Sequence, residues 1–278
     1  MQTTIVSADW LIAQDSAAIT VLDASYFLPT MGRDGRTEFA EEHIIGAQFF
    51  DIDAIKDEAN PLPHMMPDAA VFEAAMRDIG VCSDKQIVVY DNSPFLSAAR
   101  AWWMLRYFGH RAVCVLDGGM AAWKAVGGQT EKGVPAPEIG DFSAAAPYEA
   151  GLICFDELRR DVEDGAADQI IDARASERFN GLAPEPRAGL RSGHIPGALN
   201  LPIGSLLDST GKLKPAEELQ KLFDEAGFDM GVPGVTTCGS GVTAAGLTLA
   251  LAILGKTDIR LFDGSWSQWG ASDAPIEK

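Results

Sequence analysis

The chain alternates short runs of β-branched and other apolar residues with longer segments of helical periodicity. In the first half, TVLDA, QIVVYD and AVCVLDGG have the length and composition of short strands, and helical patterns separate them. In the second half, VTTC is followed by VTAAGLTLALAIL, which is long, apolar and rich in alanine. Strands that alternate with helices predict an α/β fold, a parallel sheet flanked by helices on both faces. Ligands of such sheets bind at the carboxyl ends of the strands.

The pattern occurs twice because the sequence itself is duplicated. Four segments of the first half match four of the second at offsets between 146 and 151 residues, which indicates duplication of whole domains. The pairs are AAITVLDAS (17–25) with ADQIIDARA (167–175), EEHIIGAQFFDID (41–53) with SGHIPGALNLPIG (192–204), IVVYDNS (87–93) with GVTTCGS (234–240), and VCVLDGGMAAW (113–123) with IRLFDGSWSQW (259–269).

The duplication predicts two tandem domains, and a length of 278 residues fits two domains of ordinary size. Between the matched regions lies a stretch rich in Gly, Pro and Ala, which is typical of a linker. We therefore predict a first domain at 1–128, a linker at 129–151 and a second domain at 152–278.

Composition and charge exclude several classes of partner. The hydrophobic fraction of 47% and the charged fraction of 22% are typical of a globular protein. A net charge of −18 argues against binding to nucleic acid or to an anionic membrane surface. No apolar run approaches the roughly 18 residues that span a bilayer, and the N-terminus lacks the pattern of a signal peptide. We therefore expect no nucleic-acid partner, no membrane partner and a cytoplasmic location.

One of the four cysteines occupies an unusual position. Three of them, Cys82, Cys114 and Cys154, have the sequence surroundings of small core residues or half-buried thiols, and no pair has metal-ligand spacing. Cys238 instead follows a predicted strand and precedes a glycine-rich turn and a helix. Loop amides and a helix N-terminus favour negative charge, so this position would favour a thiolate. The matching residue of the first half is Asp91, which cannot be a sulfur nucleophile, so the two halves have diverged in role.

Several motifs carry a resemblance to a known family. CGSGVTA, GHIPGALN and EPRAGLRSGHIPG, together with the tandem layout, resemble the 3-mercaptopyruvate sulfurtransferases of the two-domain rhodanese family. The resemblance implies two rhodanese-like domains, of which the second is catalytic. It further implies transfer of sulfur from 3-mercaptopyruvate to Cys238, release of pyruvate, and delivery of the persulfide sulfur to a thiophilic acceptor such as cyanide, thioredoxin or another thiol. No cofactor and no metal are implied.

The loop after the cysteine distinguishes between relatives. Thiosulfate sulfurtransferases carry basic residues just after the cysteine, whereas this chain has Gly239 and Ser240. Related phosphatases need an arginine six residues after the cysteine, and this chain has Ala244 there. The resemblance assigns donor binding to Gly239, Gly241, Val242 and Thr243 of this loop. Two alternatives stay open: a thiosulfate:cyanide sulfurtransferase and a non-catalytic rhodanese-like binding module.

Two arginines and a proton relay complete the predicted site. Arg178 and Arg187 match the substrate arginines of the mercaptopyruvate enzymes, and a guanidinium fork suits a carboxylate and its neighbouring carbonyl oxygen. The family suggests a serine, histidine and aspartate relay, which carries over to Ser240, His64 and Asp53, with histidine as the titratable group. The alternative for His64 is a cap of a surface loop.

Other candidates recur in both halves regardless of activity, so we predict structural roles for them. The matched pairs are His43 with His194, Asp117 with Asp263 in tight DG turns, and Trp123 with Trp269 in the core. Arg174 and Arg191 match no substrate role, and we expect them to be structural as well.

Overall fold

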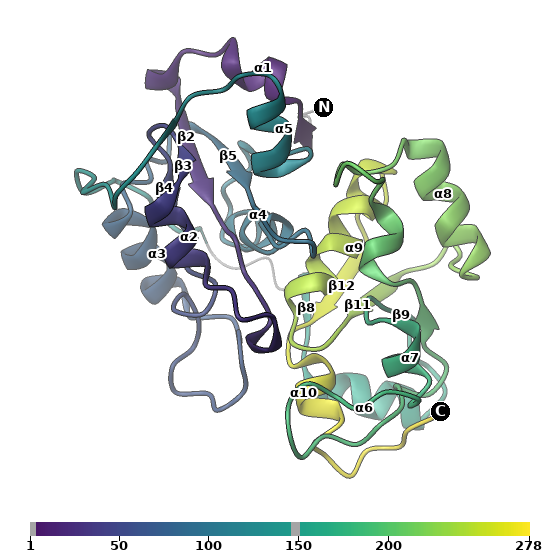
Figure 1. The fold of residues 1–278 in the computed structure, drawn as a ribbon. Coiled ribbons are helices and arrows are strands. Elements are labelled where there is room, and N and C mark those ends of the chain that lie inside the picture. The colour runs from purple at the N-terminus through teal and green to yellow at the C-terminus, as the bar shows by residue number, and fades with distance from the viewer. Residues whose placement is uncertain (1–3, 146–150) are drawn as a thin grey trace. The chain divides into compact units, whose positions relative to one another are not determined.

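The computed structural model describes residues 4–145 and 151–278, which form two compact units (Figure 1). The first unit comprises the described residues of Met1–Asp57, Met66–Tyr148 and Leu207–Leu213. The second comprises those of Glu58–Met65, Glu149–Leu206 and Lys214–Lys278. The domain boundaries at 128 and 152 stay a prediction, and residues 146–150 of the predicted linker lie outside the described residues.

The first unit is built on a five-stranded parallel sheet of order β1-β6-β5-β2-β4. Its strands are β1 (Ile5–Val6), β2 (Ile19–Asp23), β4 (Gln48–Phe49), β5 (Gln86–Tyr90) and β6 (Val113–Leu116), and β3 (His43–Ile44) pairs antiparallel with β7 (Thr130–Glu131). Its helices are α1 (Ala8–Ile12), α2 (Gly35–Glu41), α3 (Ala69–Asp78), α4 (Ala98–Tyr107) and α5 (Gly119–Ala125).

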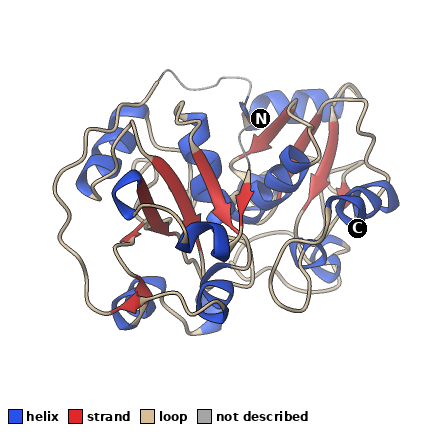
Figure 2. Ribbon diagram, turned by 90° about the horizontal axis from the view of Figure 1, so that it is seen from above, coloured by secondary structure: helices blue, strands red, loops and turns tan. Residues whose placement is uncertain are grey.

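The second unit repeats this order in a sheet that reads β8-β12-β11-β9-β10 in the same direction, again parallel throughout. Its strands are β8 (Leu152–Ile153), β9 (Gln169–Asp172), β10 (Leu199–Asn200), β11 (Gly234–Thr237) and β12 (Ile259–Phe262). Its helices are α6 (Phe155–Glu163), α7 (Ser176–Phe179), α8 (Ala216–Glu225), α9 (Val242–Ile253) and α10 (Ser265–Trp269). In each unit the strands lie between helices (Figure 2), which confirms the predicted fold class.

The burial of the elements follows their sequence patterns. Strand β5 is buried from Ile87 to Tyr90, because both faces of a parallel sheet are covered. Helix α8 is amphipathic and buries only Leu219 and Phe223, which are four residues apart and so share one face. Helix α9 is apolar on all sides and is buried along most of its length, as the run VTAAGLTLALAIL predicts.

The strand registers confirm the duplication but shift the match of 17–25 with 167–175 by one residue, because they make Asp23 equivalent to Asp172. Asp23 of β2 pairs with Tyr90, and Asp172 of β9 pairs with Thr237, so Asp91 and Cys238 follow equivalent strand ends. The amide of Met120 donates to the carbonyl oxygen of Asp91 at 3.0 Å, as the amide of Trp266 does to that of Cys238 at 2.9 Å. Sequence identity has drifted, but the same hydrogen bond holds the loop in both units.

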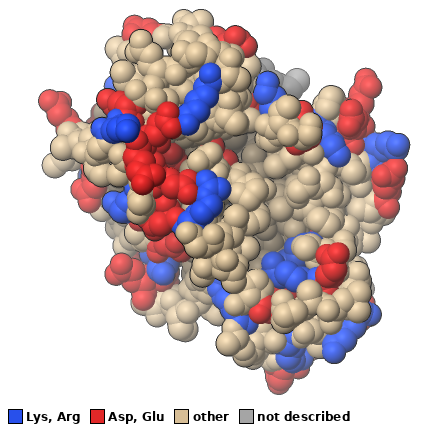
Figure 3. Space-filling model, in the orientation of Figure 1, with Lys and Arg blue, Asp and Glu red and all other residues tan. Residues whose placement is uncertain are grey.

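The charge of the chain is distributed unevenly on the face drawn in Figure 3. Acidic side chains gather over the first unit there, and basic side chains border the cluster. Ion pairs such as Arg33 with Glu38 at 2.6 Å and Arg36 with Asp51 at 2.8 Å belong to the same unit. Within the described part of the chain, no helix has both the length and the apolar character needed to cross a bilayer.

Candidate active site

Cys238 lies where strand β11 ends and helix α9 is about to begin. The amide of Gly241 donates a hydrogen bond to Cys238 Sγ at 3.1 Å, and Gly241 is the N-cap of α9. Gly241 has φ +80°, a conformation that favours glycine, so the turn that aims this amide at the sulfur depends on that residue type. The cysteine is only 2% exposed. Negative charge on the sulfur is therefore stabilised by a backbone amide and by the N-terminal end of a 12-residue helix.

Two serines of helix α10 form hydrogen bonds with the backbone of the cysteine loop. Ser265 Oγ accepts a hydrogen bond from the Cys238 amide at 3.2 Å and lies 4.0 Å from Sγ. The amide and the hydroxyl of Ser267 both donate to the Gly239 carbonyl oxygen, at 2.9 and 2.6 Å. Sequence reasoning missed these two serines because it treated the DGSWSQW segment as a structural turn. The signal was a hydroxyl at the turn position where the first half has Gly119.

His64 and Ser240 are in direct contact. His64 Nδ1 lies 3.0 Å from Ser240 Oγ, and the two side chains are buried. The segment that carries His64 comes from the first half of the sequence but belongs to the second unit, with Cys238. A cap of a surface loop would be exposed, whereas His64 is 2% exposed, so that alternative does not describe this residue. Asp53 belongs to the first unit, and its place in the relay stays a prediction.

Arg178 lies against the cysteine loop and is held by a buried carboxylate. A Cβ atom built on Gly239 would lie 3.2 Å from Arg178 Nη2, which shows how closely the guanidinium approaches the loop. Arg178 Nη2 donates to Glu185 Oε2 at 2.5 Å, and Glu185 also accepts from Arg174 Nη1 at 2.8 Å. Arg178 Nε is buried and has no hydrogen-bond partner among the residues that the structure describes. Glu185, which sequence reasoning missed, thus orients Arg178, and the Nε donor of Arg178 stays available.

Of the remaining predicted donor-binding residues, Val242 and Thr243 lie next to the cysteine loop, whereas the position of Arg187 relative to Cys238 is not established. Val242 is buried and Thr243 half-buried in the first turn of α9, directly after the loop. Arg187 is half-buried, and its side chain forms no hydrogen bond or ion pair with any residue that the structure describes. Its position relative to Cys238 stays a prediction.

The residues with predicted structural roles are used structurally. His43 Nδ1 donates to the carbonyl oxygen of Phe39 at 2.7 Å, and His194 Nδ1 donates to that of Phe179 at 2.9 Å. Arg191 donates to three backbone carbonyl groups. Arg174, Trp123 and Trp269 are buried, and Arg174 is paired with Asp172 at 2.7 Å. These observations confirm the structural roles expected of these residues.

The equivalent loop of the first unit is filled by a carboxylate. Asp91 Oδ2 accepts hydrogen bonds from the Ala98 amide at 2.6 Å and from Ser97 Oγ at 3.2 Å. Burial, together with the nearby Asp23 carboxylate, raises the pKa of Asp91 to about 6. The first unit therefore keeps the anion-binding geometry but offers no nucleophile.

Among the described residues, no group of three or more His, Cys, Asp or Glu side chains is arranged to hold a metal ion. What the site offers is a buried sulfur at a helix N-terminus, a hydroxyl–imidazole pair and a guanidinium with a free donor. Such an arrangement suits nucleophilic chemistry at sulfur with proton transfer nearby.

Comparison with known proteins identifies the family. The family model described as "Rhodanese-like domain" matches residues 8–126 and again 155–272. The chain belongs to the rhodanese family. It is 46% identical to the 3-mercaptopyruvate sulfurtransferase of Escherichia coli K12, covering 100% of this chain and 99% of the relative. It is 42% identical to the enzyme of the same name from Rattus norvegicus, covering 95% and 91%.

Solved structures agree with this assignment. The crystal structure of SseA from Escherichia coli, described as a 3-mercaptopyruvate sulfotransferase with the rhodanese fold, superimposes with a TM-score of 0.86 at 42% identity. It covers 95% of this chain and 99% of SseA. This rhodanese therefore shares the tandem architecture of its relatives over their full length, and both units are rhodanese-like.

Proposed function

We propose that this rhodanese transfers sulfur from 3-mercaptopyruvate to a thiophilic acceptor through a persulfide on Cys238, with release of pyruvate. The observation that carries the proposal is the hydrogen bond from the Gly241 amide to Cys238 Sγ at the start of α9. The first unit has a carboxylate at the equivalent place, so we assign the chemistry to the second unit alone.

In the proposed first step, the Cys238 thiolate attacks the thiol sulfur of 3-mercaptopyruvate. A sulfur–sulfur bond forms, the carbon–sulfur bond breaks, and the electron pair of that bond passes to C3 and the conjugated carbonyl as pyruvate enolate. The thiol loses one proton and C3 gains one, so the step is balanced by a relay that moves a proton between them. The Ser240–His64 contact at 3.0 Å supports this role, and we include Asp53 as the third member.

Donor recognition is assigned to Arg178 and Arg187. A guanidinium group binds a carboxylate and an adjacent carbonyl oxygen with directed hydrogen bonds, which a loop of Gly239 and Ser240 without basic side chains cannot do. Glu185 holds Arg178 beside the loop, which supports its inclusion. The loop amides from Gly239 to Thr243 complete the proposed donor site.

Thiosulfate is the alternative donor, and the names of two relatives from Arabidopsis thaliana include both donors. The acceptor in our proposal is cyanide, thioredoxin or another thiol. We also retain the cytoplasmic location and the boundaries 1–128, 129–151 and 152–278 as part of the proposal. Cell fractionation tests the location.

The decisive experiment combines persulfide mapping with donor kinetics. After treatment with 3-mercaptopyruvate, peptide mass spectrometry should find one added sulfur atom on Cys238, and Cys238→Ser should abolish turnover while the protein stays folded. Cys154→Ser is the matched control, because Cys154 is exposed and outside the loop, and it should keep full activity. Persulfide on another cysteine, or activity in Cys238→Ser, would contradict the mechanism. A higher kcat/KM for thiosulfate than for 3-mercaptopyruvate would instead contradict the donor.

A further inference from the structure

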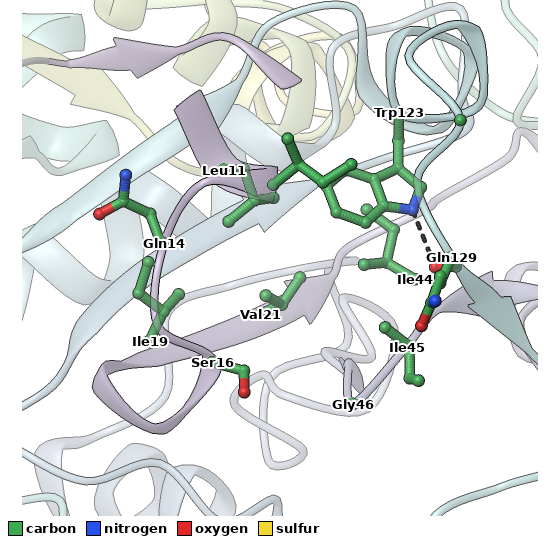
Figure 4. Close-up of a pocket in the computed structure, with 12 residues that line it drawn as sticks. Leu11, Gln14, Ser16, Ile19, Val21, Ile44, Ile45, Gly46, Trp123 and Gln129 are labelled. Atoms are coloured by element: carbon green, nitrogen blue, oxygen red, sulfur yellow. Dashed lines mark hydrogen bonds between the residues drawn. The ribbon is translucent and has the colours of Figure 1, made fainter. Parts of the chain in front are cut away.

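The first unit contains a cavity of about 590 Å³ on the side of its sheet that carries α1 and α5. Its lining residues are Leu11, Ile12, Gln14, Ser16, Ile19, Val21, Ile44, Ile45, Gly46, Trp123, Gly127 and Gln129, and none of them is charged (Figure 4). Apolar side chains form most of the wall, and Gln14 and Gln129 lie at opposite ends. The volume falls within the range of about 300–1,000 Å³ that small-molecule sites occupy.

The duplication supplies an internal reference for this cavity. The registers of β1 with β6 and of β8 with β12 make Leu11 of α1 equivalent to Leu158 of α6. Helix α6 continues to Glu163, and Val162, which is four residues beyond Leu158 and on the same face, packs against the core. Helix α1 ends at Ile12, one turn too early to provide such a side chain. The second unit fills with its own chain the space that the first unit leaves open.

Trp269 of the second unit packs against a neighbouring aromatic ring, whereas the equivalent Trp123 of the first unit does not do so within the described residues. In the second unit, Phe155 lies edge-on against Trp269, with ring centroids 5.6 Å apart. The equivalent of Phe155 in the first unit is Ala8, and Trp123 contacts no aromatic ring in the described part of the chain. Trp123 Nε1 donates to the Gln129 carbonyl oxygen at 2.9 Å, which fixes the indole in the cavity wall.

The rim of the cavity has changed from charged to apolar. In the second unit, Arg260 pairs with Glu157 at 2.5 Å and with Asp168 at 2.9 Å. The registers make Cys114, Trp10 and Ile19 the equivalents of Arg260, Glu157 and Asp168, and Ile12 the equivalent of Arg159. Of these four residues of the first unit, Ile12 and Ile19 line the cavity. Ile12 and Ile45, which both line the cavity, are each 48% exposed. Since exposed apolar side chains are costly in water, their concentration around a cavity points to a ligand.

We propose that this cavity is a binding site for an uncharged, predominantly apolar aromatic molecule, stacked or edge-on against Trp123. A wall without charged side chains excludes an ionic ligand, because nothing would compensate its desolvation. The amides of Gln14 and Gln129 and the hydroxyl of Ser16 can accept or donate one or two hydrogen bonds at the ends of such a molecule. The site is distinct from the cysteine loop and does not depend on the proposed function.

The test uses indole as the probe and the side-chain N–H signals of the tryptophans in a ¹⁵N-labelled protein. Indole should shift the Trp123 Nε1–H signal in a saturable way and leave that of Trp269 unchanged, because the equivalent space there is filled. Val21→Phe fills the cavity and should weaken binding by about tenfold or more. Ile12→Arg restores the charged rim of the second unit and should also weaken it. Val134→Arg is the matched control, since Val134 is 63% exposed and outside the cavity, and it should bind as the wild type does.

Three results would overturn the proposal. One is a Trp123 signal that does not move up to the solubility limit of indole. Another is non-specific contact. It would appear as an equal shift of the Trp123 and Trp269 side-chain N–H signals, or as an equal weakening of indole binding by Ile12→Arg and Val134→Arg. The third is concentration-dependent dimerisation in sedimentation that Ile12→Arg abolishes, because the apolar rim would then be an interface between two copies of this chain. If Val21→Phe fails to fold, Ile12→Arg decides the question alone, because its side chain is exposed.

Discussion

Arg187→Ala should separate donor recognition from stability. The side chain of Arg187 is half-buried and has no hydrogen-bond or ion-pair partner among the described residues, so its removal leaves no buried group unpaired. Arg178 differs, because it is paired with Glu185, whose side chain is 2% exposed. We therefore expect Arg187→Ala to lose activity without losing stability, and Arg178→Ala to lose both.

The size of each effect follows from the contacts. A hydrogen bond to a charged group contributes about 1.5–3 kcal/mol, which converts to a loss of roughly ten- to 150-fold in kcat/KM for 3-mercaptopyruvate. Without Arg178, Glu185 keeps only its hydrogen bond from Arg174, so the free energy of unfolding should also fall by about 1–3 kcal/mol. Arg187→Ala should leave it unchanged within about 0.5 kcal/mol, as is usual away from buried networks.

The assay measures kcat/KM for 3-mercaptopyruvate and for thiosulfate, together with urea unfolding, in both variants. Arg160→Ala is the matched control, because Arg160 is an exposed arginine of the same unit whose one ion pair within the described part of the chain is with Asp161, at 3.5 Å. Arg187→Ala should lose much more activity with 3-mercaptopyruvate than with thiosulfate, because only the former presents a carboxylate beside a carbonyl. Equal losses for the two donors would mean that Arg187 only shapes the site. Activity equal to that of Arg160→Ala would refute its role as a ligand.

Three further predictions concern the relay and the two equivalent loops. His64→Ala should lower kcat for 3-mercaptopyruvate by about 10²- to 10⁴-fold and change the pH–rate profile, with little change in donor binding; an unchanged profile would make His64 structural. The pKa of Asp91 is raised from 3.8 to about 6, so burial of its charge destabilises the folded state increasingly as pH rises through this window. Asp91→Asn should therefore raise the free energy of unfolding by up to about 3 kcal/mol near pH 8 and little near pH 4, as denaturant titrations can show; equal effects at both values would be the contrary result. Ser265→Ala and Ser265→Gly both remove the hydroxyl that accepts a hydrogen bond from the Cys238 amide. Because Ser265 has φ +48°, a conformation that favours glycine, Ser265→Gly should be more stable than Ser265→Ala by about 1 kcal/mol. Equal stabilities of these two variants would show that the backbone is not strained there.

Much of the fold could be predicted from the sequence because the strand and helix patterns are local and because they occur in both halves of the chain. Alternating short strands and helical segments predicted parallel sheets, and the apolar run after Cys238 predicted α9 within one residue of its observed bounds. The duplicated segments also identified Asp91 as the residue of the first unit that is equivalent to Cys238, and the strand registers confirm this equivalence. Periodicity and repetition determine such features because they depend on neighbouring residues along the chain.

What the sequence could not provide is contact between distant segments. His64 is 176 positions from Ser240, and nothing local to its loop shows that the segment packs with the second unit. The roles of Glu185 and Ser265 are equally hidden, because each acts through a contact that only the folded chain creates. The cavity beside Trp123 arises because α1 stops one turn earlier than α6, a difference in length whose consequence is visible only when both helices lie on their sheets. Sequence alone determined the elements and pointed to Cys238 as the proposed nucleophile. Tertiary packing decided which side chains surround it, since burial and hydrogen bonding depend on which distant segments of the chain come into contact.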